Sequence, residues 1–171
     1  MTFIILTLDM SIVIKNFSLK VTINGRVPMA ILADTNVLAT APLDMILSGY
    51  GDVIGKYSCL SDWRLSALVN GEYLCEDVWQ ATMREVKKVR AIAKKIAAKE
   101  PEAVGALMES LVAVGVLMAY VGNSRPASGS EHHLSHYFEI TGIVNGEKYL
   151  AHGVDVAYST VITARIREEI L

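Results

Sequence analysis

The chain has 171 residues, of which 52% are hydrophobic and 20% are charged, and its formal net charge is −2. This length and apolar content are sufficient for one domain with a substantial core. Modules that bind nucleic acid normally carry a strong positive balance, so we expect no nucleic-acid partner. The basic runs at 87–90 and 94–95 are interpreted as the solvated face of an amphipathic helix.

The cysteines and the apolar segments bear on the cellular compartment. Cys59 and Cys75 have no CxxC spacing, which argues against a disulfide framework and against a thiolate metal site. The first ten residues have no basic region and include Asp9, unlike a signal peptide. The apolar run 111–122 is shorter than the roughly 20 residues that span a bilayer, and it predicts a buried core helix. We therefore expect a cytoplasmic protein without a membrane segment.

The periodicity of apolar residues predicts a mainly α fold, a helical bundle preceded by a short β-hairpin. Residues 17–33 alternate as strands around Asn24-Gly25, the strongest short-range hairpin signal. The helix that starts at Glu100-Pro101 is apolar on nearly all sides, which predicts a place at the centre of the bundle. The pattern and the capping residues predict helices at about 42–49, 51–67, 76–98, 101–122, 130–142 and 152–171.

All four histidines of the chain lie within one short stretch, at positions 132, 133, 136 and 152. His132 and His136 are four residues apart, so a helix places both imidazoles on one face. His133 points about 100° away from His132, so we expect it to support a ligand from behind or to lie on the surface, and not to bind the metal itself. Histidine is the commonest metal ligand and a ready proton shuttle.

A carboxylate and two imidazoles could form a metal site. Asp52 is expected near a helix start after Gly51, and His152 at the start of the last helix, before Gly153. Such a donor set, completed by His132, suits zinc or ferrous iron and leaves an open position for water or substrate, as in catalytic sites. On spacing alone, helix histidines that bind no metal remain an open alternative.

Three segments of the chain resemble a known family. They are GYGDVIGKYSCLSDWRLS, NSRPASGSEHHLSHYFE and AHGVDVAYSTVITARI. These segments are similar to the metal-binding C-terminal domain of glycerol-1-phosphate dehydrogenases, within the superfamily of iron-containing alcohol dehydrogenases, glycerol dehydrogenases and dehydroquinate synthases. The resemblance runs from about Val21 to the C-terminus. It implies that residues 1–35 are a remnant of the end of the nucleotide-binding domain and that 36–171 form the helical metal-binding domain.

The resemblance also implies roles for individual residues. The family's metal ligands fall on Asp52, His132 and His152, and its substrate-contacting residues on Asp52 and His136. Asp9 matches an aspartate that contacts substrate in a Ser-x-Asp-Gly segment of the family, although the glycine is lost here.

The residue four positions after the aspartate separates two types of metal site in the superfamily. Some alcohol dehydrogenase relatives have a fourth ligand, a histidine, where this chain has Lys56. The implied metal is therefore Zn2+ bound by three residues, with Fe2+ or Ni2+ as alternatives. Lys56 and Arg125 are candidates for binding a substrate phosphate by charge alone.

In such enzymes a metal holds the substrate oxygen while hydride passes between the adjacent carbon and the nicotinamide of NAD or NADP. The implied function is the metal- and substrate-binding half of such a dehydrogenase, acting on a small polyol or polyol phosphate. The chain departs from the family at Val154-Asp155, where a glutamate-lysine pair is usual, and it stops short of the family at both ends. It also has no GGG loop for the dinucleotide phosphates, so no cofactor-binding residue is assigned.

The shortened ends favour self-association into a homo-oligomer, because apolar surface would otherwise be exposed. One alternative is a non-catalytic metal-binding remnant or fragment that self-associates. Two others are a metal-assisted hydrolase and a bundle that binds no metal.

Overall fold

The computed structural model describes residues 30–148 and 150–170, and this part of the chain is mainly helical. The predicted helical bundle is confirmed in this coarse form. The expected hairpin is not supported: residues 30–34 form no strand, and the rest of it, like Asp9, lies outside the described residues. The helices of the described residues are α1 (Thr35–Ala39), α2 (Leu43–Asn70), α3 (Glu76–Ala91), α4 (Ala93–Ala97), α5 (Pro101–Val121), α6 (Ser130–Asn145) and α7 (His152–Ile170).

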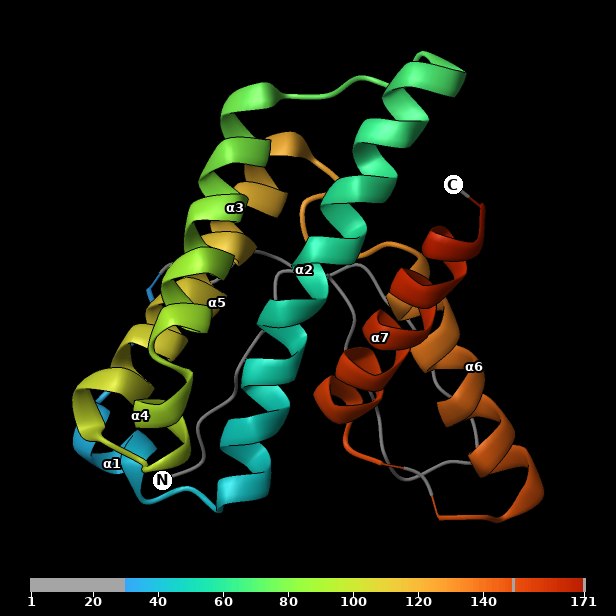
Figure 1. Ribbon diagram of the computed structural model, residues 1–171. Helices are drawn as coiled ribbons and strands as arrows, with labels where there is room; N and C mark the ends of the chain where they lie inside the picture. The colour runs from blue at the N-terminus through green and yellow to red at the C-terminus, as the bar shows by residue number, and fades with distance from the viewer. Residues whose placement is uncertain (1–29, 149, 171) are drawn as a thin grey trace.

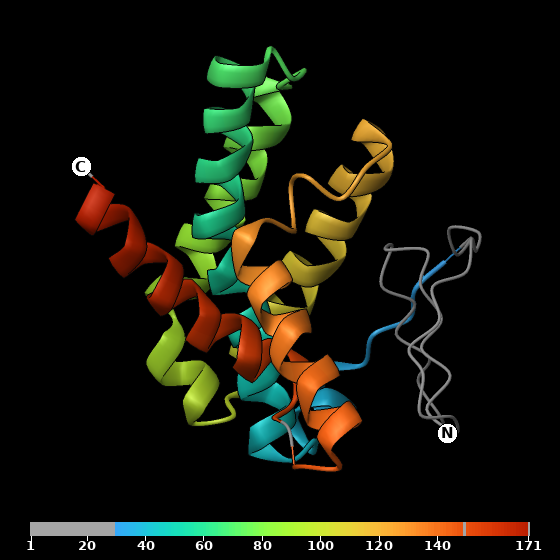
Figure 2. The same cartoon turned by 90° about the vertical axis from the view of Figure 1, so that its right-hand side faces the viewer.

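The long helix α2 runs through the middle of the bundle (Figure 1). It contacts α3, α4 and α5 on one side and the α6–α7 pair on the other. One apolar cluster lies between α2, α3, α4 and α5, and it includes Val53, Val86 and Leu107. A second cluster surrounds the buried Trp63 near the C-terminal end of α2. The view turned by 90° shows α6 and α7 side by side and crossing α2 (Figure 2).

The two short helices expected at 42–49 and 51–67 are one continuous helix, α2. The sequence pattern treats Gly49 and Gly51 as breaks, since glycine is unfavourable inside a helix. Gly51 instead provides space for another backbone: a Cβ atom there would lie 2.2 Å from the carbonyl oxygen of Gly153 in α7. The expectation that Asp52 opens a helix is therefore wrong, because this residue lies well inside α2.

Helix α5 is not at the centre of the bundle. It packs mainly on α3 and α1, and its far side leaves Val116 55% exposed and Tyr120 81% exposed. The helix has the bounds predicted from the sequence, Pro101–Val121, so the apolar run 111–122 is only part of a 21-residue helix. By length and apolar composition alone it could cross a membrane, so the expected lack of a membrane segment stays a prediction.

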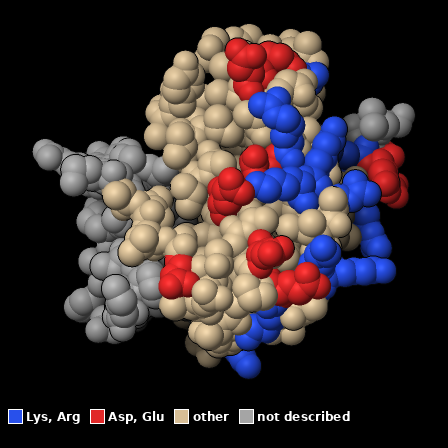
Figure 3. Space-filling model, turned by 90° about the vertical axis from the view of Figure 1, so that its left-hand side faces the viewer, with Lys and Arg blue, Asp and Glu red and all other residues tan. Residues whose placement is uncertain are grey.

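The basic face expected on residues 76–98 is divided between α3 and α4, which meet at Ile92. Figure 3 shows Lys and Arg side chains on this side of the molecule interspersed with Asp and Glu. Lys88, for example, is bonded to Glu109 of α5 at 2.7 Å and to Glu85 at 3.4 Å. This arrangement is a solvated face with local ion pairs and not a continuous positive surface.

Candidate metal centre

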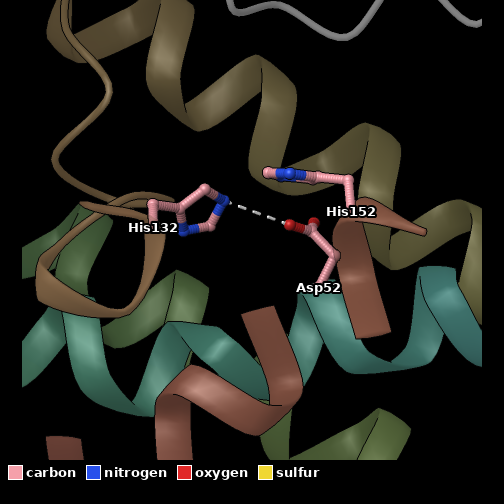
Figure 4. Close-up of side chains that lie close together, drawn as sticks. All are labelled: Asp52, His132 and His152. Atoms are coloured by element: carbon pink, nitrogen blue, oxygen red, sulfur yellow. Dashed lines mark ion pairs between the residues drawn. The ribbon is translucent and has the colours of Figure 1, made fainter. Parts of the chain in front are cut away.

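Three helices bring the expected ligands together. Asp52 comes from the middle of α2, His132 from the first turn of α6, and His152 is the first residue of α7. One donor atom from each residue lies within 4.8 Å of the other two. Nε2 of His132 is 3.3 Å from Oδ1 of Asp52, and His152 lies beside both (Figure 4). The residues singled out from the sequence thus converge on one point.

The close crossing of α2 and α7 sets the distance between Asp52 and His152. Each of these residues adjoins a glycine, Gly51 or Gly153, that touches the opposite backbone. A Cβ atom on Gly153 would lie 1.8 Å from the carbonyl oxygen of Ser48, and the Ser48 hydroxyl accepts the Gly153 N–H at 3.0 Å. The glycines therefore let the two helices approach closely enough for their neighbouring side chains to share a site.

The start of α6 is fixed to α2 by contacts that hold His132 in place. The N-cap residue Gly129 has no side chain to cap the helix, and Oδ2 of Asp62 in α2 accepts the Ser130 N–H at 2.7 Å instead. A Cβ atom on Gly129 would lie 2.7 Å from Cα of Cys59, so only glycine fits against α2 here. Arg167 of α7 binds both Asp62 and the Ser130 hydroxyl, which connects all three helices.

A buried lysine neutralises the candidate carboxylate ligand. Nζ of Lys56 lies 2.9 Å from Oδ2 of Asp52, and the lysine is only 2% exposed. Burial would raise the pKa of Asp52, but the Lys56 charge and hydrogen bonds from His132 and Lys56 outweigh it and hold this pKa well below its ordinary value. Asp52 is therefore ionised at neutral pH and can serve as a metal ligand.

His132 lies between two carboxylates. Its Nε2 faces Asp52, and its Nδ1 is 2.7 Å from Oε1 of Glu131. Burial would lower the pKa of His132, yet the hydrogen bonds to Asp52 and Glu131 raise it above its usual value. Glu131 was not predicted from the sequence as part of the site, although an acidic residue directly before a candidate ligand could have indicated it.

The remaining candidates are placed as follows. The His136 ring lies beside the cluster, with its centroid 5.5 Å from that of His152, and His133 is exposed. Arg125 is held by Glu72, because its Nε and one terminal nitrogen each donate to a carboxylate oxygen at 2.7 Å. The two candidates for phosphate binding, Arg125 and Lys56, thus both have carboxylate partners in this structure.

The donor set fits a divalent transition metal. One carboxylate and two imidazoles are typical ligands of zinc and ferrous iron, and three protein donors leave a position for water or substrate. The ligand atoms are close enough together for a single ion to reach all of them. The residues present are therefore suited to the metal that the resemblance implies.

No protein-family model matches the chain. It is 36% identical to a glycerol-1-phosphate dehydrogenase (NAD(P)+) of Bacillus licheniformis over 89% of the chain and 38% of that relative. The resemblance to glycerol-1-phosphate dehydrogenases is confirmed. The enzyme of that name from Sulfurisphaera tokodaii is 38% identical over 90% of the chain and 43% of the relative, and that from Geobacillus thermodenitrificans is 38% identical over 84% and 35%. The chain thus spans about two fifths of the length of the glycerol-1-phosphate dehydrogenases that it matches.

Proposed function

We propose that this chain is the metal- and substrate-binding part of an NAD(P)-dependent glycerol-1-phosphate dehydrogenase. The observation that carries the proposal is the convergence of Asp52, His132 and His152 within 4.8 Å, in a chain related to proteins of that name. Zinc is the first candidate for the ion, with Fe2+ or Ni2+ as alternatives. In this proposal residues 36–171 are the metal-binding domain and residues 1–35 the end of the nucleotide-binding domain.

The proposed reaction oxidises the secondary alcohol of glycerol-1-phosphate. A hydride leaves the carbon that carries this hydroxyl for the nicotinamide ring, and the hydroxyl loses its proton, which gives dihydroxyacetone phosphate and NAD(P)H. A bound divalent metal supplies a Lewis acid that favours loss of this proton. His136, beside the metal ligands, is proposed to hydrogen-bond a substrate hydroxyl.

The nicotinamide cofactor is proposed to come from residues other than these 171. The chain contains no run of glycines that could receive the dinucleotide phosphates. We therefore expect turnover only when a nucleotide-binding part of the family is present together with this chain, and we place the reaction in the cytoplasm.

Zinc binding by the purified chain tests the metal site. The metal-free protein should bind one equivalent of zinc in competition with a chromophoric chelator. Asp52→Ala and His152→Ala should each weaken binding at least about tenfold, since each removes one of three donors. His133→Ala is the matched control, because this histidine is exposed on the same helix as His132. Substoichiometric zinc in the wild type, or equal affinities in all the variants, would contradict the proposal.

Activity tests the second half of the proposal. The zinc-loaded chain, mixed with the nucleotide-binding part of a relative, should oxidise NADH in the presence of dihydroxyacetone phosphate. The Asp52→Ala variant should show no such NADH oxidation. Tight zinc binding without turnover would favour the alternative of a non-catalytic metal-binding protein.

We also propose that the chain forms a homo-oligomer. Large apolar side chains are exposed on several helices, among them Leu68 (80%), Tyr120 (81%) and Val144 (77%). Burying such side chains between copies of the chain would remove apolar area from water. Light scattering coupled to size-exclusion chromatography should give a mass of at least twice 18.6 kDa, and a monomer at micromolar concentration would contradict this part of the proposal.

A further inference from the structure

Glu131 is a fully buried carboxylate next to a candidate ligand. It is the second residue of α6, has no exposed surface, and lies against α2, where a Cβ on Gly55 would be 3.5 Å from its Cγ. Its Oε1 is 3.0 Å from the N–H of Gly129 and 2.7 Å from Nδ1 of His132. Its Oε2 is also buried, with no hydrogen-bond partner among the described residues. Burial of a carboxylate is costly unless it is well bonded, so this position requires an explanation.

The hydrogen bonds of Glu131 determine which nitrogen of His132 carries a proton. Oε1 accepts the Gly129 N–H, and as a carboxylate oxygen it has a second lone pair that accepts a further N–H. The nitrogen 2.7 Å from the same oxygen must then be the donor, and His132 is protonated at Nδ1. Nε2 faces Asp52 at 3.3 Å and carries a proton while it bonds this carboxylate. When the ring holds a single proton, the shorter 2.7 Å contact with Glu131 favours Nδ1–H and leaves the lone pair of Nε2 for a metal.

We propose that Glu131 is the positioning residue of the metal centre, which fixes the tautomer and the ring orientation of His132 so that Nε2 is the metal-binding atom. The inference rests on the proposed metal site. Metal-binding histidines usually donate their other N–H to a carboxylate, a carbonyl group or water, and loss of such a partner typically weakens metal binding about 10- to 100-fold. Here the partner belongs to the adjacent residue, so the first turn of α6 supplies both the ligand and its orienting group.

A purely structural role for Glu131 would be to bond the Gly129 N–H at the start of α6. The two roles differ in what they require of the side chain. A hydrogen bond to Gly129 forms with either tautomer of His132, whereas the positioning role requires the Nδ1–H tautomer. Glu131→Gln retains a carbonyl oxygen that can accept both N–H groups but removes the charge. Glu131→Ala removes both bonds.

The first measurement uses the metal-free chain, so it does not depend on whether the site binds metal. Nitrogen-15 chemical shifts of the histidine rings, recorded at alkaline pH where the imidazoles are neutral, report which nitrogen is protonated. We expect the Nδ1–H tautomer for His132 in the wild type, in Glu131→Gln and in the control Glu147→Gln, whose carboxylate is exposed just beyond α6. Glu131→Ala should shift His132 towards the Nε2–H tautomer. An Nε2–H tautomer in the wild type would overturn the proposal.

The second measurement is zinc affinity by chelator competition, with circular dichroism as the check on folding. Glu131→Ala should bind zinc about 10- to 100-fold more weakly than the wild type, Glu131→Gln should show a smaller loss, and Glu147→Gln none. Wild-type affinity in a folded Glu131→Ala variant would overturn the inference while leaving the proposed function intact. If the wild type binds no zinc, the proposed function fails, and the tautomer still decides whether Glu131 orients His132. If Glu131→Ala does not fold, the wild-type tautomer and the affinity of Glu131→Gln decide.

Discussion

Replacing Gly51 by alanine tests whether the close crossing of α2 and α7 builds the metal centre. The added Cβ atom would lie 2.2 Å from the carbonyl oxygen of Gly153 and 3.0 Å from Cβ of Ala157. Ordinary contact begins at 3.4 Å, so the two helices would have to separate locally by about 1 Å. The nearest atom belongs to a backbone and not to a flexible side chain, so it cannot simply rotate away.

Two effects of opposite sign set the change in stability. Overpacking of this kind costs about 1–3 kcal/mol, whereas alanine in place of glycine inside a helix gains up to about 1 kcal/mol. The clash dominates, and we expect a net loss of about 1–2 kcal/mol, which corresponds to a melting temperature lower by about 2–8 °C. Gly49→Ala is the matched control in the same helix, because its Cβ would lie 3.5 Å from Leu111 in ordinary contact. This control should be stabilised by up to about 1 kcal/mol.

The assay combines thermal unfolding of the metal-free chains, followed by circular dichroism, with zinc competition. Gly51→Ala should also weaken zinc binding at least about tenfold, since its neighbour Asp52 would move relative to His152 by more than a ligand tolerates. Gly49→Ala should bind zinc like the wild type. The reasoning is refuted if Gly51→Ala is as stable as Gly49→Ala, or if it binds zinc with unchanged affinity.

Three further predictions concern the polar groups around the site. Lys56→Met should destabilise the metal-free chain by about 1–2 kcal/mol because it leaves the half-buried Asp52 with His132 alone as a charged partner. It should also tighten zinc binding because a positive charge is removed; unfolding by urea and chelator competition measure the two effects. Because the pKa of His132 is raised in the folded chain, its protonation contributes stability that is complete below about pH 6.5 and is lost as pH rises through the folded-state pKa. The melting temperature of the metal-free chain should therefore fall above neutrality. His132→Gln should flatten this part of the plot of melting temperature against pH. Asp62→Ala removes the group that caps α6 at Ser130 and should cost about 1–2 kcal/mol, measured by urea unfolding, whereas Asp44→Ala at an exposed position should cost less.

The candidate ligands could be predicted because their residue types are chemically distinctive. Histidine is rare in this chain, and all four histidines lie between positions 132 and 152, so the cluster is easy to recognise in the sequence. Periodicity and capping residues also predicted most of the helices, including the starts of α5 at Pro101 and of α7 at His152. Such features depend on local chemistry, which a sequence records directly.

The continuity of α2 could not be predicted from local propensity. Gly49 and Gly51 are unfavourable inside a helix when it is considered alone. The close contact that favours Gly51, with Gly153, comes from a segment about 100 residues away. The position of α5 was misjudged for a related reason. An apolar helix does not reveal how many of its sides have neighbours, and here Tyr120 and Val116 have few. Long-range packing decided both outcomes.

Glu131 was missed because its sequence neighbourhood does not reveal its burial. A glutamate in the first turn of a helix is ordinarily explained by the helix dipole. Only the packing of α6 against α2 and α7 shows that this carboxylate is removed from water and directed at His132.

The sequence separation of the three candidate ligands has a consequence for how fast the protein is degraded. Asp52, His132 and His152 belong to segments that are adjacent only in the folded chain, whereas the unfolded chain retains just the local His132–His136 pair as a weak chelate. An ion at this centre would therefore act as a cross-link between α2 and the α6–α7 pair, and at about 100 times its dissociation constant it would add about 2.7 kcal/mol to the free energy of unfolding. Because many proteases cleave only the transiently open chain, the local zinc supply would then determine how long each molecule survives degradation.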